Sequence, residues 1–347
     1  MRSAGELAAA LPHLCGFVPH ESLVLISLRG PRQRVGLTMR VDLPPPEHEA
    51  ALVRELVPRL VADGARAAIT FVVTEEAGER PRAALADALR RGLRRAGIRS
   101  RDRVLLRDGR WWSYDCTDLR CCPPGGTPLS GAAESVQLVE ARAALDGTAV
   151  LPSREALVAS LAAPTDPALA DRLAAASAAR ERRLRVEGRV RVGREALAHW
   201  RRALRRVLDR EVTPSDPVAD LHLGPAARAA LVVSLADAVV RDEVLTWAID
   251  DSEPLLSLLL ELAGSSVPPH DAPVCALVGW VAHARGTGAL ANVALDRALA
   301  SDPSYGLALL CRHALDSQVS PAAVKALLRD ARGALHREHP WTAPAFR

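Results

Sequence analysis

One short segment gathers many of the chain's uncommon and reactive side chains. Residues 111–126 read WWSYDCTDLRCCPPGG and hold two of the six tryptophans, one of the two tyrosines and three of the six cysteines. The segment follows a predicted strand, and loops presented by a rigid scaffold often carry binding or catalytic groups. The candidate ligand-binding residues are Trp111, Trp112, Tyr114, Asp115, Cys116, Cys121 and Cys122.

Zinc is one interpretation of this segment, with the thiolates of Cys116, Cys121 and Cys122 as ligands. A structural zinc site takes four ligands, typically from paired C-x₂₋₄-C motifs. The spacing here is C-x₄-C-C without a neighbouring histidine, so a fourth ligand would have to come from a distant residue such as His13 or His20. No other cofactor is indicated.

Two further interpretations of the cysteines need no metal. A reactive thiol would need a nearby base or positive charge, such as Arg120, to lower its pKa. Alternatively, the segment is a tightly turned structural loop, because cysteine without a disulfide is among the most buried residue types. The residue types alone leave all three interpretations open.

A second candidate site is an arginine-rich helix. Residues 180–210 contain 12 arginines and 4 acidic residues. An apolar stripe at helical spacing runs from Leu197 through Trp200 to Leu208, and four arginines lie off it. These phosphate-binding candidates are Arg201, Arg202, Arg205 and Arg206. Because the only aromatic residue lies on the apolar stripe, no stacking platform is evident, and a solvated helix face is the competing interpretation.

Composition narrows the class of protein further. The net charge of +4 is too small to indicate nucleic-acid binding by itself, and only 3% of residues are aromatic. The chain lacks the GxxxxGK[ST], HExxH and GxSxG motifs. GTGALA at 286–291 fits GxGxxA but follows a helix rather than a strand, which indicates an inter-helix loop. We see no signal peptide and no apolar run of about 20 residues, so we expect a cytoplasmic protein without a membrane partner.

The elements that position these groups divide the chain into two parts. Up to about residue 130, strand and helix patterns alternate in the order ββαβαββ, with Asp108-Gly109 as a hairpin turn. This order predicts an α/β domain over 1–130, with helices packed on a mixed sheet. We expect strands at 22–28, 34–43, 67–74, 103–106 and 110–114, and helices at 3–14, 47–62 and 81–96.

Residues 131–347 are predicted to form an all-helical domain, because no convincing strand pattern remains after Gly131. Connections are marked by proline and glycine. The expected helices are 131–146, 153–163, 166–187, 194–211, 224–249, 252–264, 272–286, 289–301, 304–316 and 320–337.

One helix pair in this part, at 272–305, fits a tetratricopeptide-like unit. Gly279, Ala291, Ala298 and Pro303 fall at the spacings of that repeat, whose period is about 34 residues. We find no second copy. A single pair must pack against neighbouring helices, and a solenoid would leave a concave face for a protein partner. A globular bundle would fill that face.

Four segments of the chain are distinctive: LPHLCGFVPHESLVLISL (11–28), GRWWSYDCTDLRCCPPGGTPL (109–129), LADAVVRDEVL (235–245) and GALANVALDRALASDPSYGLALL (288–310). In these segments the sequence resembles the actinobacterial proteins classed as domain of unknown function 4192. The resemblance implies an α/β part followed by a helical part, and it implies no activity. Two departures are visible: Cys15 stands where the family is aliphatic, which suggests a packing residue, and Gly125 stands where an acidic residue is expected.

Three functions remain in competition. We favour a non-enzymatic interaction or regulatory protein whose helical part binds a protein partner. An enzyme of unrecognised type would use the cysteine-containing site at 111–126. A nucleic-acid-associated protein would use the arginine-rich segment at 180–210. A pocket lined by Tyr114, Cys116 and Cys122 would favour the enzyme, and a continuous positive surface would favour nucleic acid.

Overall fold

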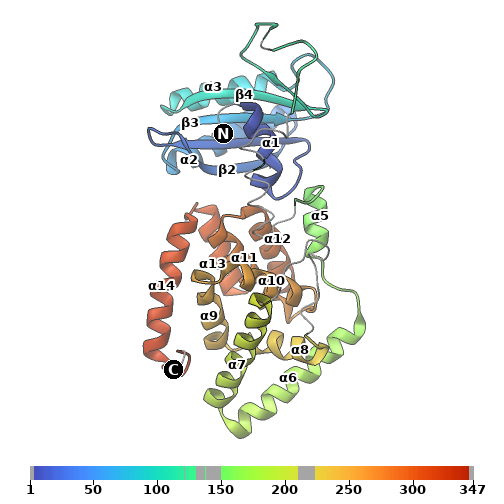
Figure 1. Cartoon of the computed structure of the whole chain (residues 1–347), viewed down its shortest axis with the longest axis vertical. Coiled ribbons are helices and arrows are strands. Elements are labelled where there is room, and N and C mark those ends of the chain that lie inside the picture. Colours follow the sequence, from blue (N-terminus) through green and yellow to red (C-terminus); the bar gives the residue numbers. More distant parts are fainter. Residues whose placement is uncertain (1–3, 121, 130–136, 138–149, 210–222, 344–347) are drawn as a thin grey trace. The chain divides into compact units, whose positions relative to one another are not determined.

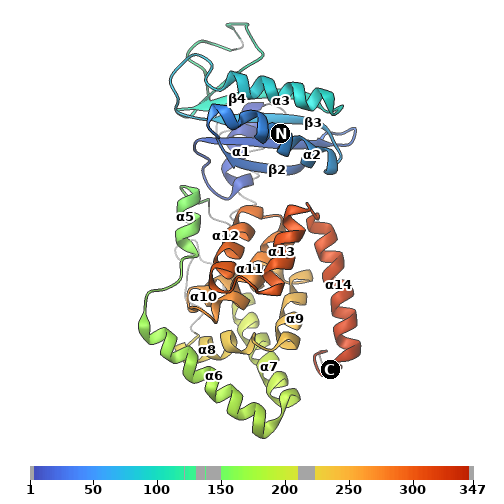
Figure 2. The ribbon, with the colours of Figure 1, turned by 180° about the vertical axis from the view of Figure 1, so that it is seen from behind.

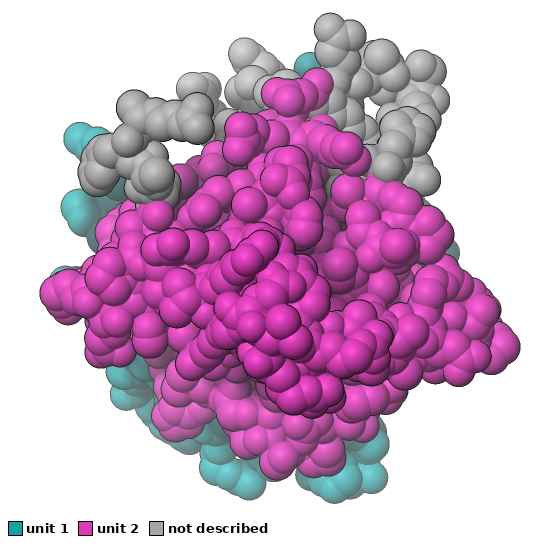
Figure 3. Space-filling model, turned by 90° about the horizontal axis from the view of Figure 1, so that it is seen from below, with its two compact units in different colours: residues 1–156 teal, residues 157–347 magenta. Residues whose placement is uncertain are grey.

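The chain folds into two compact units, Met1–Ala156 and Leu157–Arg347 (Figure 3). The computed structural model describes residues 4–120, 122–129, 137, 150–209 and 223–343. The domain boundary expected at residue 130 and most of the helix expected at 131–146 lie outside the described residues.

The first unit contains a six-stranded mixed sheet within the described residues, ordered β2-β1-β3-β4-β5-β6. Neighbouring strands are antiparallel except β3 and β4, which are parallel and are joined through a helix. The two-residue strand β6 is too short for a sequence pattern to reveal. The strands are β1 (Ser22–Arg29), β2 (Arg34–Asp42), β3 (Ala65–Val73), β4 (Arg99–Arg107), β5 (Arg110–Ser113) and β6 (Thr127–Pro128).

Helices cover both faces of this sheet (Figures 1 and 2). Helix α1 (Ala4–Cys15) lies on one face, while α2 (Glu49–Ala62), preceded by the 3₁₀ helix η1 (Pro46–His48), and α3 (Ala83–Arg95) lie on the other. Strand β1 is buried along nearly its whole length because its side chains alternate between these two layers. The stripe expected on α3 is confirmed, since its members are all buried, namely Leu85, Leu89 and Leu93.

Helix α3 begins later than the sequence pattern indicates. The pattern places its first residue at Pro81, but Arg82 is the N-cap and has a left-handed φ of 58°. Pro81 is buried instead, and its carbonyl accepts a hydrogen bond from the hydroxyl of Tyr114 at 2.6 Å. The chain therefore turns sharply between β3 and α3.

The second unit contains helices joined by turns, and no strand among its described residues, as the sequence pattern predicts. The single helix expected at 224–249 is wrong: the chain breaks at Asp237, whose carboxylate caps a new helix by accepting from the amide of Val239 at 2.9 Å. The helices are α5 (Arg154–Ser160), which begins at the end of the first unit, α6 (Pro167–Glu187), α7 (Arg189–Leu208), α8 (Pro225–Ser234), α9 (Ala238–Thr246), η2 (Trp247–Ile249), α10 (Ser252–Ala263), α11 (Asp271–Arg285), α12 (Gly288–Ser301), α13 (Gly306–Asp316) and α14 (Pro321–Glu338).

Helix α11 is the centre of this bundle. Nearly all of its residues are buried, and it packs against α8, α9, α10, α12, α13 and α14. The closest approach is to α12, where a Cβ on Gly279 would lie 2.8 Å from the side chain of Leu295. Ala291 and Ala298 are fully buried, as small residues at a close helix contact should be. Helices surround nearly all of α11, so no concave groove runs along it among the residues that the structure describes.

None of the helices in the described ranges combines the length and apolarity that crossing a membrane requires.

Candidate functional site

Strand β5 sends the two tryptophans of the cysteine segment to opposite faces of the sheet, as successive strand residues must go. Trp111 packs on helix α1, where a Cβ on Gly5 would lie 2.9 Å from its Nε1. Trp112 packs against the apolar core between the sheet and helices α2 and α3. The two rings therefore act in separate layers and do not form one aromatic surface.

Trp112 holds the loop that follows β5. Its Nε1 donates to the carbonyl of Pro124 at 2.9 Å, and the guanidinium of Arg107 lies 5.2 Å from its ring centroid. Gly126, with φ of +72°, lies so close to the ring that a Cβ would meet Cε2 at 2.4 Å. Arg110 donates to the carbonyl of Gly125 at 2.6 Å. The end of the loop is thus folded tightly back onto β5.

Tyr114 and Asp115 are engaged inside the unit. Tyr114 is buried, and burial raises the pKa of its hydroxyl above the usual range. The carboxylate of Asp115 pairs with Arg103, which is only 4% exposed and also donates to Asp87 at 2.5 Å. Arg103 therefore fixes the start of the loop to strand β4 and helix α3.

The cysteines of the segment are placed only in part. Cys116 and Cys122 are half-buried, and the amide of Cys122 donates to the carbonyl of Asp118 at 2.7 Å. Cys121 lies outside the described residues. Across the part of the chain that the structure describes, no group of three or more His, Cys, Asp and Glu side chains is placed to hold a metal ion. Because one proposed ligand lies outside that part, zinc binding by Cys116, Cys121 and Cys122 stays a prediction.

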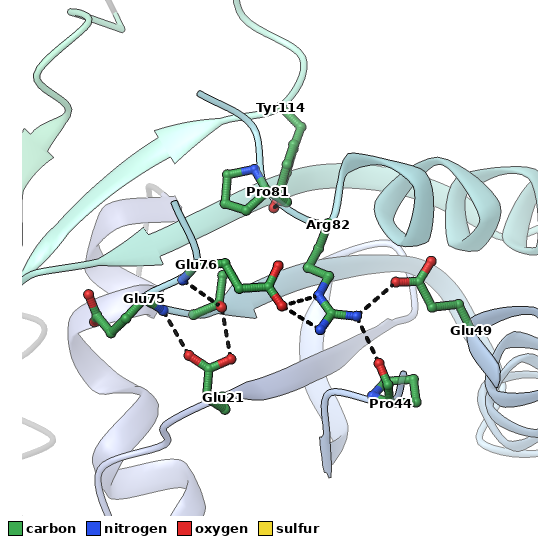
Figure 4. A network of polar contacts seen from close by, with 9 residues as sticks. Glu21, Pro44, Glu49, Glu75, Glu76, Pro81, Arg82 and Tyr114 are labelled. Atoms are coloured by element: carbon green, nitrogen blue, oxygen red, sulfur yellow. Dashed lines mark hydrogen bonds and ion pairs between the residues drawn. The ribbon is translucent and has the colours of Figure 1, made fainter. Parts of the chain in front are cut away.

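A polar network that the sequence did not reveal occupies the edge where β3 and β4 end and where α2 and α3 begin (Figure 4). Ligands of open α/β sheets bind outside the carboxyl ends of the parallel strands, so this edge is a natural site position. The hydroxyl of Thr74 donates to Glu21 at 2.8 Å, and the amide of Glu75 donates to the same carboxylate at 2.8 Å. Glu21 thus fastens the loop after β3 to the start of β1.

Arg82 joins the other half of this network. Its Nε donates to Glu76 at 2.8 Å, and its Nη1 reaches the Pro44 carbonyl at 2.8 Å and Glu49 at 3.2 Å. The hydrogen bond to Glu76 is the largest cause of a raised pKa of the Arg82 guanidinium. Glu21 has φ of 38° and Arg82 has φ of 58°, an uncommon conformation for residues other than glycine.

The hydrogen bonds at this edge position the loop after β3 and the start of α3. Glu21 and Arg82, the two residues of the network with a left-handed backbone, hold their neighbours through charged hydrogen bonds. Backbone strain of this kind persists only where the surrounding structure imposes it. A possible sequence signal was Thr74-Glu75-Glu76, which places two carboxylates directly after a buried strand. The partner of Thr74 and Glu75 is Glu21, which lies 53 and 54 residues away, so no local pattern links them.

The four arginines predicted to bind phosphate have different surroundings. Arg201 has partners inside the helical unit. Its Nη2 donates to the Thr342 carbonyl at 2.7 Å and lies 3.6 Å from Glu243. Arg205 lines a surface pocket together with Leu208 and Trp247. Arg202 and Arg206 are exposed and have no ion-pair partner within the described residues.

Most other arginines around this helix hairpin are neutralised. Arg183 pairs with both Glu187 and Glu195, and Arg189 makes a bidentate pair with Asp237. The pKa of His199 is lowered, first by burial and then by the charge of Arg202. The positive charge that remains available on α7 is therefore concentrated on a few exposed residues.

Comparison with known proteins assigns a family without an activity. No curated protein and no solved structure matches the chain significantly. The family model described as Domain of unknown function (DUF4192) matches residues 5–322. This match covers both compact units, including the loop after β5 and the whole of α7, so the chain belongs to the DUF4192 family.

Proposed function

We propose that this protein is a non-catalytic binding protein whose helical unit binds an acidic protein partner through the outer face of α7. We define this face by Arg194, Arg202 and Arg206. The observation that carries the proposal is that these three arginines are exposed and have no ion-pair partner within the described residues, whereas Arg183, Arg189 and Arg191 of the same hairpin are paired. Uncompensated charges attract an oppositely charged partner and set the rate and orientation of its docking.

The raised pKa values of three buried cysteines support a binding role over catalysis by these thiols. Burial raises the pKa of Cys15 to about 11 and the pKa of Cys275 and of Cys311 to about 12. The thiolate is the nucleophile, so these three cysteines are unsuited to covalent chemistry near neutral pH. In the loop after β5, Tyr114 and Asp115 are engaged in structural hydrogen bonds.

In this proposal the helix pair at 272–305 is a single tetratricopeptide-like unit with a structural role. Its first helix is surrounded by neighbours rather than lining a groove. Its role is to form the centre of the bundle, which leaves partner binding to helices on the outside, such as α7.

A nucleic acid is the second candidate, since the same arginines could contact phosphates. The single aromatic side chain of α7, Trp200, is fully buried, so bases would find no ring in α7 on which to stack. This favours a protein partner over a single-stranded nucleic acid.

The test compares two polyanions of equal charge, a fluorescent polyglutamate peptide and a single-stranded oligonucleotide, on the full chain. We expect salt-sensitive binding of the peptide that weakens at least about tenfold in R202E/R206E, since attraction becomes repulsion. The matched control is K325E/R329E, which reverses two cations at the same spacing on α14 and should leave the affinity within about twofold. Preferred binding of the oligonucleotide, or equal loss in both variants, would overturn the proposal.

A further inference from the structure

A surface pocket of about 250 Å³ lies between α7 and the turn that joins η2 to α10. Pockets for drug-sized ligands usually measure roughly 300–1,000 Å³, so this one suits a smaller molecule. Arg205 and Leu208 line it from α7, and Trp247 and Asp251 line it from the opposite side. No local sequence pattern reveals it, because the residues on its two sides are 39 to 50 positions apart in the chain.

One wall of the pocket is apolar and fixed in place. Leu208, which the helical pattern assigned to the buried stripe, is 50% exposed and faces the pocket instead. The ring of Trp247 is held by a hydrogen bond from its Nε1 to Glu243 at 3.0 Å, and the guanidinium of Arg201 lies 5.5 Å from its centroid. This wall therefore offers a rigid aromatic and aliphatic surface.

Two of the four charged side chains that line the pocket already have partners within the protein. Asp250 pairs with Arg332 at 2.6 Å, and Arg201 donates to the Thr342 carbonyl and lies near Glu243. Arg205 and Asp251 have no side-chain hydrogen bond or ion pair within the described residues. The pocket thus presents one uncommitted cation and one uncommitted anion beside an apolar wall.

We propose that this pocket binds a small zwitterion with an apolar body, of the class of a free aliphatic or aromatic α-amino acid. The ligand carboxylate accepts from the Arg205 guanidinium, its ammonium donates to Asp251, and its side chain lies against Leu208 and Trp247. A phosphate monoester would meet the carboxylates of Asp250 and Asp251, and a simple amine would leave Arg205 without a partner. The site is separate from the proposed partner surface, because Arg202 and Arg206 do not line it.

Calorimetric titration of the full chain with L-leucine tests the site. Two analogues separate the charges: 3-methylbutylamine lacks the carboxylate, and 4-methylpentanoate lacks the ammonium. We expect leucine to bind at least about tenfold more tightly than either analogue, since each omitted group leaves one charged hydrogen bond unmade. Leucine binding should fall by a similar factor in R205Q and in D251N.

The variants also discriminate between the two contacts. D251N should bind 4-methylpentanoate as well as the parent does, because that analogue never contacts Asp251, while R205Q should lose it. R202Q, a neighbouring exposed arginine outside the pocket, should bind leucine like the parent. Absence of leucine binding at tens of millimolar, equal affinity for leucine and its analogues, or tighter binding of phosphate would each overturn the proposal.

Discussion

The guanidinium of Arg297 lies against the buried carboxylate of Asp271, with Nε 3.1 Å from Oδ2. The same guanidinium donates to the carbonyls of Leu161 at 2.9 Å and Ser266 at 2.7 Å, and Ser301 donates to Asp271 at 2.6 Å. One arginine therefore joins α12 to the start of α11 and to two loops. The ion pair is closed to solvent, since the Asp271 side chain is only 1% exposed.

We predict that R297L destabilises the helical unit by about 3–5 kcal/mol, because it leaves the Asp271 carboxylate buried without a counter-charge. Urea denaturation followed by tryptophan fluorescence measures the change. R191A is the control, since Arg191 is exposed and its ion pairs with Glu187 and Glu195 should contribute less than about 1 kcal/mol. Equal destabilisation by both variants would contradict this account.

Enlarging the contact between α11 and α12 should strain it. Ala291 is fully buried beside Gly279, so A291L should cost about 1–3 kcal/mol of unfolding free energy. Ala300 lies on the same helix and is exposed, so A300L should change stability by less than about 0.5 kcal/mol. If A291L melts like the parent protein, the close helix contact is misassigned.

The loop after β5 should depend on a single glycine. G126A places a Cβ where Trp112 already lies and imposes a left-handed φ on alanine, so we expect a loss of about 1–3 kcal/mol and faster proteolysis of the loop. G125A is the neighbouring control, because its Cβ would meet nothing within 4 Å and its φ is not positive. Matching proteolysis rates for the two variants would rule out a role for the Trp112 contact.

Asp237 should make part of the helical unit's stability depend on acidity. Burial opposes its ionisation, but hydrogen bonds and charge from Arg189, with the α9 amides, outweigh burial and lower the pKa below 3.8. A lowered pKa stabilises the folded state above the unfolded value, and this contribution disappears as pH falls through the folded pKa. Parent stability should therefore decline as pH falls below about 4.

D237N tests this dependence because asparagine can still cap α9. We expect D237N to be less stable than the parent at pH 7 by about 1–3 kcal/mol, since the charged pair with Arg189 is lost. Denaturation curves of the two proteins should differ at pH 7 and should coincide at acid pH, where Asp237 is protonated in the parent. A constant difference between the two proteins across that range would exclude Asp237 as the titrating group.

Local patterns predicted the elements of this chain better than its sites. Apolar spacing located the helices from 252 onward to within two residues, because each helix buries one stripe or more in the bundle. The break at Asp237 was missed because the apolar residues on its two sides keep a helical spacing. The surroundings of Arg82 and Trp247 could not be predicted, since their partners come from other elements that only the folded chain brings together.

The burial of α11 on every side has a consequence for how the helical unit unfolds. In a linear repeat array each unit touches only its neighbours, so ends can fray and a terminal repeat can be removed while the rest stays folded. Here α10, α12, α13 and α14 all border the same helix. Deleting α14 would expose α11 to water, and none of these four helices can detach while the others keep a complete core. The unit should therefore melt in one cooperative step, with a calorimetric enthalpy equal to its van't Hoff enthalpy.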